Sequence, residues 1–255
     1  MDLVIETHEL TKRYDGFTAV DALELEVRAG EIFGFLGPNG AGKSTTILML
    51  LGLTEASGGS VRVLGYDPAR QPIEVKRRVG YMPENLGFYG DLTGRENLEY
   101  VAELNDIPRD EARRRIDAAL EKVRMAGEDR KLVGAYSRGM RQRLGIAEIL
   151  IKEPQLIIFD EPTLGLDPEG ITAMLQLIKD LSTEESISVL MCSHLLYQAQ
   201  NICDRVGILN QGRLVAKGSM DELAGGGLTA ADGTLRLEDI YMRYFQEEEN
   251  AQGVS

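Results

Sequence analysis

Eight consecutive residues near the start of the chain have the types and spacing of a phosphate-binding loop. In order they are Gly37, Pro38, Asn39, Gly40, Ala41, Gly42, Lys43 and Ser44. The pattern Gly-x4-Gly-Lys-Ser lets backbone N–H groups turn toward phosphate oxygens, and a following helix aims its positive end at the same anion. We expect Lys43 to reach the β- and γ-phosphates of a nucleotide and the Ser44 hydroxyl to bind Mg²⁺. The alternative is a glycine-rich turn with a chance lysine, which the strand pattern before the loop and the helix pattern after it disfavour.

Two adjacent carboxylates, Asp160 and Glu161, form the second chemical element. They end the apolar run Leu156–Phe159, which predicts a buried strand. Because side chains alternate along a strand, the two carboxylates point in different directions. We expect Asp160 to hold Mg²⁺, usually through water, and Glu161 to polarise the attacking water. An apolar strand ending in two acids is common, so this interpretation depends on its pairing with the phosphate-binding loop.

Short apolar strands alternate with helices around these residues. Ile32–Leu36 feeds the phosphate-binding loop, and Ile47–Leu51 is predicted to be a buried helix. Leu156–Phe159 and Ile187–Cys192 are predicted strands, separated by a helix over Ile171–Leu181. This order indicates a parallel sheet covered on both faces.

Other segments follow different periods. Leu23–Arg28 and Val61–Val63 alternate apolar and polar residues, which predicts half-buried strands. Val206–Asn210 and Leu214–Ala216 predict a hairpin. The charged stretch Thr93–Ile151 predicts helices, among them one over residues 109–125 with an apolar stripe.

The predicted fold class is therefore α/β, a P-loop NTPase core with a parallel sheet, an N-terminal antiparallel β subdomain and an inserted α-helical lobe. We place the ATPase domain at residues 1–220, with the lobe at about 85–151. Residues 221–255 are expected to hold a linker, a break at Gly225–Gly227, a short helix over Leu237–Phe245 and a loose acidic tail.

Composition narrows the possible partners. The net charge is −13, which argues against nucleic acid and against anionic lipid, because both are bound mainly by basic faces. Two cysteines, Cys192 and Cys203, fit a reducing compartment. We find no stretch of 18 or more apolar residues and no secretory signal pattern, so we expect no direct bilayer insertion. If the chain serves a membrane process, another chain must cross the membrane.

The segment Tyr136–Arg143 resembles the signature of ABC-type ATPases and lies, as in that family, about twenty residues before the acidic pair. Kinases and GTPases share the phosphate-binding loop but lack this ordered series. The resemblance covers the chain from about Leu3 to Ser219. It includes Thr163–Pro168, which is similar to the family's D-loop, and His194, which matches its switch histidine.

The resemblance implies that two such domains pack head to tail and trap two ATP molecules between them. Ser137 and the Gly139 N–H would then donate to the γ-phosphate bound by the other domain, so that ATP drives closure and hydrolysis permits opening. Tyr14 would stack on adenine. Thr45, in the helix after the loop, and Asp167, in the D-loop, complete the expected nucleotide-binding residues.

Several positions depart from the family pattern. Tyr136 stands where Leu is usual, Arg138 where Gly is usual, and Met140 where Gln is usual. Glu84 takes the place of the Q-loop glutamine; its carboxylate can approach Mg²⁺ but is repelled by the γ-phosphate. These residues are similar to ATP-binding domains of ABC-2-type exporters, which often carry a glutamate there and a Tyr-Ser-x-Gly-Met signature.

The leading hypothesis is an ATP-hydrolysing subunit that energises an integral membrane permease from the cytoplasmic face of the membrane, as a homodimer or a heterodimer. The main alternative is a soluble ABC ATPase such as an iron–sulfur assembly factor, which fractionation with membranes or with soluble partners would distinguish. A small-molecule kinase is a third, less favoured class. The cargo stays open because the permease selects it.

Overall fold

The computed structural model describes residues 2–224, 237–239 and 241–243. The chain divides into two compact units, one from Met1–Val75 and Ser188–Ser255 and the other from Lys76–Ile187. The helix predicted over Leu237–Phe245 is helical at its described residues. The predicted break at Gly225–Gly227 and the predicted tail at 246–255 lie outside the described residues.

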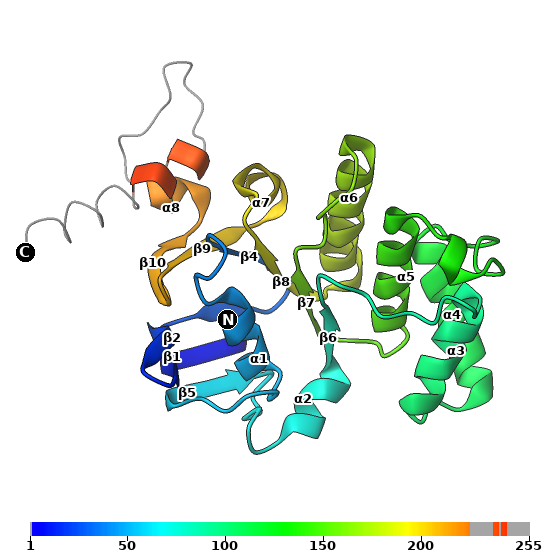
Figure 1. Cartoon of the computed structure of the whole chain (residues 1–255), viewed down its shortest axis with the longest axis horizontal. Helices are drawn as coiled ribbons and strands as arrows, with labels where there is room; N and C mark the ends of the chain where they lie inside the picture. Colours follow the sequence, from blue (N-terminus) through cyan, green and yellow to red (C-terminus); the bar gives the residue numbers. More distant parts are fainter. Residues whose placement is uncertain (1, 225–236, 240, 244–255) are drawn as a thin grey trace, which may run out of the picture. The chain divides into compact units, whose positions relative to one another are not determined.

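The first unit begins with an antiparallel sheet (Figure 1). Its strands are β1 (Leu3–Tyr14), β2 (Phe17–Leu23), β3 (Glu26–Arg28) and β5 (Gly58–Val63), and β1 pairs with each of the other three. This sheet confirms the predicted antiparallel β subdomain.

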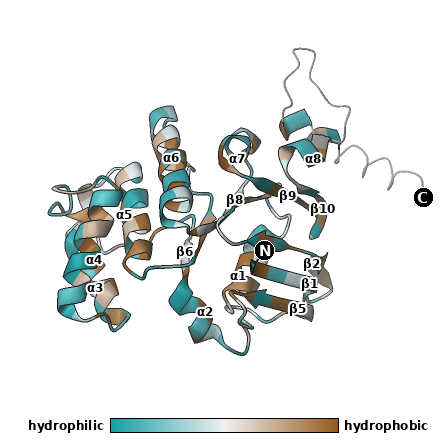
Figure 2. Cartoon of the chain, turned by 180° about the vertical axis from the view of Figure 1, so that it is seen from behind, coloured by the Kyte–Doolittle hydropathy of each residue, from teal (hydrophilic) through white to brown (hydrophobic). Residues whose placement is uncertain are grey.

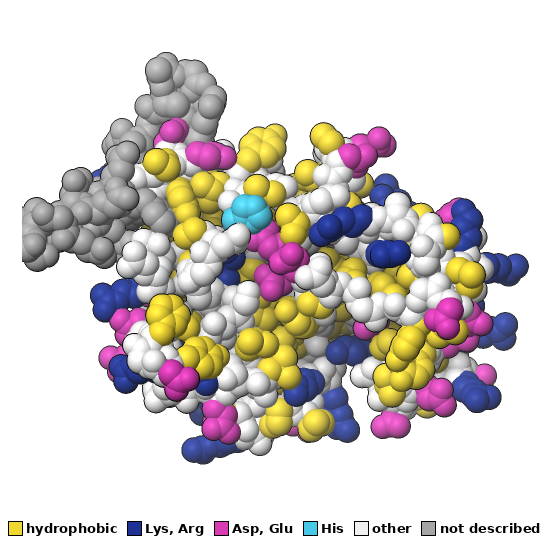
Figure 3. All heavy atoms as spheres, viewed as in Figure 1, with side chains coloured by type: hydrophobic (Ala, Val, Ile, Leu, Met, Phe, Trp, Pro, Cys, Tyr) yellow, Lys and Arg dark blue, Asp and Glu magenta, His cyan; other side chains and the backbone are white. Residues whose placement is uncertain are grey.

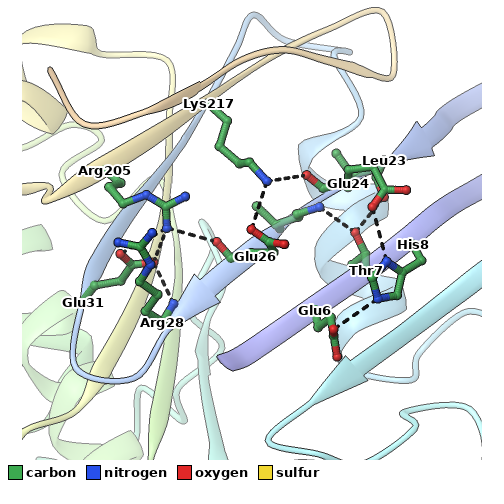
Figure 4. A network of polar contacts seen from close by, with 11 residues as sticks. Glu6, Thr7, His8, Leu23, Glu24, Glu26, Arg28, Glu31, Arg205 and Lys217 are labelled. Carbon is green, nitrogen blue, oxygen red and sulfur yellow. Dashed lines mark hydrogen bonds and ion pairs between the residues drawn. The ribbon is translucent and has the colours of Figure 1, made fainter. Parts of the chain in front are cut away.

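The predicted strand Leu23–Arg28 is wrong in detail, because it is interrupted between the end of β2 and the start of β3. The buried Thr7 hydroxyl donates to the Leu23 carbonyl at 2.7 Å and accepts from the Leu25 N–H at 2.8 Å (Figure 4). A side chain thus takes over hydrogen bonds that a continuous ladder would make. The apolar alternation survives the break, since Leu23, Leu25 and Val27 are fully buried.

The second sheet of this unit contains β4 (Ile32–Leu36), β8 (Ser188–Ser193), β9 (Arg205–Asn210) and β10 (Arg213–Gly218). β4 pairs in parallel with both β8 and β9, and β10 returns antiparallel to β9 as the predicted hairpin. All five β4 residues are buried, which explains its unbroken apolar sequence.

The start of β4 is fixed by a buried ion pair. Glu31 accepts from the Arg28 N–H at 2.7 Å and from the Arg205 guanidinium at 3.1 Å (Figure 4). The Asp204 carboxylate also accepts from the Ile32 N–H at 2.8 Å. These bonds fix the strand that leads into the phosphate-binding loop.

Helices of the first unit are α1 (Lys43–Leu50), α7 (Leu196–Ile202) and α8 (Met220–Ala224), and α2 (Pro72–Arg78) crosses into the second unit. α1 is coloured mostly as hydrophobic and α2 mostly as hydrophilic in Figure 2. α1 starts four residues earlier than the predicted Ile47–Leu51, because the phosphate-binding loop turns directly into it.

The second unit carries two parallel strands, β6 (Val79–Met82) and β7 (Leu156–Asp160), and most of the helices. The predicted helical lobe is confirmed as α3 (Gly94–Leu104), α4 (Arg109–Lys122) and α5 (Arg138–Leu150), with α4 packed against the other two (Figure 1). A 3-10 turn, η1 (Val133–Ala135), precedes α5.

The last helix of the second unit, α6, runs over Pro168–Glu185 and is longer at both ends than the predicted Ile171–Leu181. The Asp167 carboxylate caps it and Pro168 occupies its first turn, which is a favourable helix start that residue periodicity alone does not reveal.

No helix among the described residues is long and apolar enough to cross a bilayer. Basic and acidic side chains are interspersed on the face drawn in Figure 3.

Candidate functional site

The phosphate-binding loop joins the end of β4 to α1. The N-cap of α1 is Gly42, with φ of 107°, and no side chain accepts from the first N–H groups of the helix. Uncapped helix N–H groups and the positive end of the helix dipole together attract an anion. The local structure therefore suits a phosphate group.

Two glycines of this loop have no room for a side chain. A Cβ on Gly37 would lie 2.3 Å from the Leu209 carbonyl oxygen, and a Cβ on Gly42 would lie 2.5 Å from the Ala19 carbonyl oxygen. Gly40 faces open space but has φ of 82°, which favours glycine. The loop is thus held against β9 and β2 at Gly37 and Gly42, and it is open at Gly40.

Lys43 is curled back over the loop. Its Nζ donates to the Gly37 carbonyl at 2.6 Å and to the Pro38 carbonyl at 3.1 Å, and the residue is only 7% exposed. Ser44 beside it is exposed and Thr45 is half-buried. The hard hydroxyl oxygen of Ser44 suits Mg²⁺, and the buried ammonium needs a polar partner, which a phosphate would supply as well as the carbonyls do.

Tyr14 ends β1 and is 43% exposed, with the Lys12 ammonium 4.8 Å from its ring centroid. It is paired with Phe17, the first residue of β2, which is 64% exposed. Phe17 is not among the nucleotide-binding residues expected from the sequence. Asp15-Gly16 forms a two-residue turn between two strand patterns, and such a turn places its flanking residues, Tyr14 and Phe17, opposite each other. This pattern would have identified Phe17 together with Tyr14.

His194 lies close to the phosphate-binding loop in the topology of the first unit. β8 and β4 are parallel neighbours, and Ser193 is paired with Leu36. His194 and Gly37 are the residues that follow this pair. The His194 side chain is exposed, and the chain turns after it because the Leu195 N–H donates to the Ser193 hydroxyl at 3.0 Å.

The acidic pair ends β7 in the second unit. Asp160 is half-buried, whereas Glu161 is 8% exposed and has φ of 54°. A left-handed conformation costs a non-glycine residue about 1–3 kcal/mol and is typical of functional sites. Gly would adopt this backbone at less cost, so the Glu161 carboxylate is placed at the end of β7 against the local conformational preference.

The D-loop segment follows in a tight turn. The Leu164 N–H donates to the Glu161 carbonyl at 3.1 Å, and the Leu166 N–H donates to the Thr163 carbonyl at 3.2 Å. The exposed Asp167 carboxylate accepts from the Gly170 N–H at 2.8 Å and caps α6. Its side chain therefore has a structural partner here, in addition to the nucleotide role that the sequence suggests.

The signature segment enters α5 through Ser137. Its hydroxyl oxygen is the N-cap and accepts from the Met140 N–H at 3.2 Å, which leaves the hydroxyl hydrogen free to donate elsewhere. Ser137 is exposed and Gly139 is half-buried. The first turn of α5 contains no acidic residue, so its positive end keeps its attraction for anions.

Tyr136, which departs from the family pattern, is explained by packing. Its ring is buried and its hydroxyl donates to the Glu128 carbonyl at 2.8 Å, close above Gly94. Burial raises the pKa of Tyr136, and the nearby Asp129 and Glu128 raise it further. A leucine could fill this space but could not satisfy the carbonyl.

Glu84, which follows β6, is exposed. The loop after it is tied to α3: the Asn97 side chain accepts from the Tyr89 N–H at 3.0 Å and donates to the Tyr89 carbonyl at 3.1 Å. Leu86 packs against Gly145 of α5. Tyr89 stays 51% exposed and makes an edge-on contact with Tyr100, whose ring centroid lies 5.4 Å away.

Comparisons with known proteins agree with these features. The ABC transporter family model matches residues 20–164. The bacitracin transport ATP-binding protein BcrA of Bacillus licheniformis is 44% identical over 223 residues, which cover 88% of this chain and 72% of that protein. The daunorubicin resistance ATP-binding protein DrrA3 of Streptomyces coeruleorubidus is 37% identical, with 87% and 70% covered. A solved ATP-binding subunit of an ABC transporter superposes with a TM-score of 0.83 at 31% identity, with 95% of this chain and 99% of that chain covered.

Proposed function

Because this chain belongs to the ABC transporter family and is an ATP-binding, ATP-hydrolysing subunit of it, we propose that it energises a membrane permease of the ABC-2 exporter type. The main support for nucleotide binding comes from the N-terminus of α1. This end of the helix is uncapped, and the loop before it follows a fully buried strand and has glycines where a side chain would collide. The two relatives named above serve different compounds, bacitracin and daunorubicin, which fits cargo selection by the permease.

ATP binding begins at the phosphate-binding loop. Lys43 exchanges its two carbonyl partners for β- and γ-phosphate oxygens, and the α1 N–H groups bind the phosphate chain. Tyr14 stacks on adenine, and Phe17 beside it adds a second exposed ring. Ser44, Asp160 and Glu84 would supply hard oxygen ligands for Mg²⁺, and the ion would neutralise charge on the β- and γ-phosphates.

Hydrolysis requires a water molecule in line with the γ-phosphate. Glu161 accepts a proton from this water as its oxygen attacks phosphorus, and the bond to the β-phosphate oxygen breaks. The buried setting of Glu161 suits this role because it limits competing water. His194 donates to the γ-phosphate and so orients it for attack.

A second copy of an ABC ATPase subunit, identical or different, completes the site. Ser137 and the Gly139 N–H of one subunit donate to the γ-phosphate bound by its partner. Support comes from the exposed Ser137 hydroxyl at the start of α5 and from the absence of acidic residues in that turn. Asp167, at the start of α6, belongs to the same interface.

We propose that residues 1–220 form this ATPase domain, with the helical lobe at about 85–151. We further propose that the domain lies on the cytoplasmic face of the membrane.

The permease contact is proposed at the loop after Glu84. Leu86 is occupied by packing on α5, whereas Phe88 is half-buried and Tyr89 is largely exposed beside Tyr100. Exposed aromatic side chains on a loop fixed by Asn97 are suitable anchors for an amphipathic helix.

Changing Phe88 and Tyr89 together to Ser tests this contact. We expect the isolated subunit to keep most of its ATPase activity, while co-purification with the membrane chain weakens and export fails. Leu132→Ser, another exposed apolar residue of the same unit, is the matched control. Full membrane association and transport by the double variant would place the contact elsewhere, and loss of its folded state would show that the aromatics only seat the lobe.

A further inference from the structure

The helix α5, which Ser137 caps, contacts the loop that follows Glu161. The Gln142 side chain, on α5, is 5% exposed, and its Nε2 donates to the Leu164 carbonyl at 3.4 Å. No described residue donates to its Oε1. A buried amide with one unsatisfied oxygen is costly, so its position between the helix and the loop calls for an explanation.

Two further contacts join the same elements. The Arg138 guanidinium lies over Gly165, where an added Cβ would be only 2.8 Å from Cζ. Leu166 lies 3.5 Å from the position of a Cβ on Gly139. The start of α5 and residues 164–166 therefore form one packed patch, which includes the buried Gln142.

Leu164 connects this patch to the acidic pair. Its carbonyl accepts from Gln142, and its N–H donates to the Glu161 carbonyl at 3.1 Å. Two successive hydrogen bonds therefore join α5 to the carbonyl of Glu161, the residue with the left-handed conformation. Because no described residue donates to the Oε1 of Gln142, this oxygen is able to accept a further hydrogen bond if the loop and α5 rearrange.

We propose that Gln142 is a positioning residue that links engagement of Ser137 by the partner's nucleotide to the placement of Glu161 for hydrolysis. The inference rests on the proposed function, since it needs Ser137 to act in the dimer and Glu161 to act on water. Gln142 itself touches neither the nucleotide nor water in this scheme.

The first test replaces Gln142 by Met, which keeps the length of the side chain and removes the amide. Losing one hydrogen bond that orients the base is expected to lower kcat about threefold to tenfold. The KM for ATP and ATP binding by the monomer should stay within twofold, because Lys43 and Ser44 are untouched. The matched control is Gln176→Met, which also loses a side-chain hydrogen bond, to Asp180, but on an exposed turn of α6. Equal kcat values for the two variants would overturn the proposal.

Gln142→Glu provides a readout that a purely structural role would not produce. When protonated, the new carboxyl can donate to the Leu164 carbonyl; when ionised, it repels that oxygen and is buried without a donor. We expect the ratio of its kcat to that of the parent to fall as pH rises through the pKa of this carboxyl, whereas the ratio for Gln142→Met stays flat. A flat ratio for both, with folding verified by thermal melts, contradicts the link.

The outcomes separate this inference from the function on which it rests. If the parent protein hydrolyses ATP and Glu161→Gln abolishes turnover, the proposed function stands whatever the Gln142 variants do. If Glu161→Gln leaves turnover intact, the proposed function fails first, and an effect of Gln142 would then need another cause.

Discussion

Ser137→Asp separates the two roles assigned to Ser137, as cap of α5 and as donor across the dimer. Ser137 caps the helix by accepting from the Met140 N–H. Aspartate is an equally good N-cap, so we expect the free energy of unfolding of the variant to change by less than about 0.5 kcal/mol. Ser137→Ala, by contrast, loses the cap and should lose about 1 kcal/mol, or roughly 2–4 °C in Tm for a chain of this size.

In dimer formation the two variants should rank the other way, with Ser137→Asp impaired more than Ser137→Ala. The new carboxylate would face the γ-phosphate of the partner's nucleotide in each of two sites. Like charges about 5 Å apart at an effective dielectric constant near 20 repel by roughly 3 kcal/mol, which weakens association by more than about 100-fold per site. Ser137→Ala removes only a hydrogen bond and should weaken it by about tenfold.

The assay is size-exclusion chromatography with light scattering, with and without ATP, in the Glu161→Gln background so that ATP is retained. Binding of a fluorescent ATP analogue to the monomer is the control and should be unchanged, because the phosphate-binding loop is intact. If Ser137→Asp dimerises as well as its parent, or if it loses as much thermal stability as Ser137→Ala, the division of roles is wrong.

Two predictions concern stability. Thr93→Ala removes the capping box that starts α3 and should lower Tm by about 2–4 °C. The control Thr172→Ala, on the exposed face of α6, should lower Tm less. Equal Tm values for the two variants would show that the capping box contributes nothing to stability. Burial raises the pKa of Glu148 above its ordinary value, and the nearby Lys152 only partly offsets this. The folded protein therefore binds the proton of this carboxyl group more tightly than the unfolded chain does. Its stability should fall as pH rises above about 4.5. Glu148→Gln should therefore raise Tm at pH 7, with a gain that disappears in melts below pH 4.5; a gain independent of pH would exclude this cause.

Much of the fold follows from local sequence. The glycine-rich loop, the apolar strand before it, the helix after it and the charged helical lobe are local patterns. The structure contains the strand and helices that they predict, with some bounds shifted. The start of α6 could also have been predicted, because Asp167-Pro168 is a strong helix start. The apolar periodicity alone places the start of this helix later in the chain.

Other features depend on distant partners and could not be predicted. The break before Glu26 exists because Thr7 lies beside it in space, 18 residues from Leu25 in the chain. The role of Tyr136 depends on a backbone carbonyl at Glu128, which no residue type encodes. The left-handed Glu161 contradicts local preference and reflects the turn that follows β7.

The most direct measurement compares ATP turnover and ATP-dependent dimerisation of the parent protein and Glu161→Gln. Glutamine keeps the shape of the side chain and removes its ability to accept a proton. We predict that the variant binds ATP, accumulates as an ATP-bound dimer and turns over about 10²–10⁴-fold more slowly. Near-normal turnover, or no dimer at saturating ATP, would contradict the account.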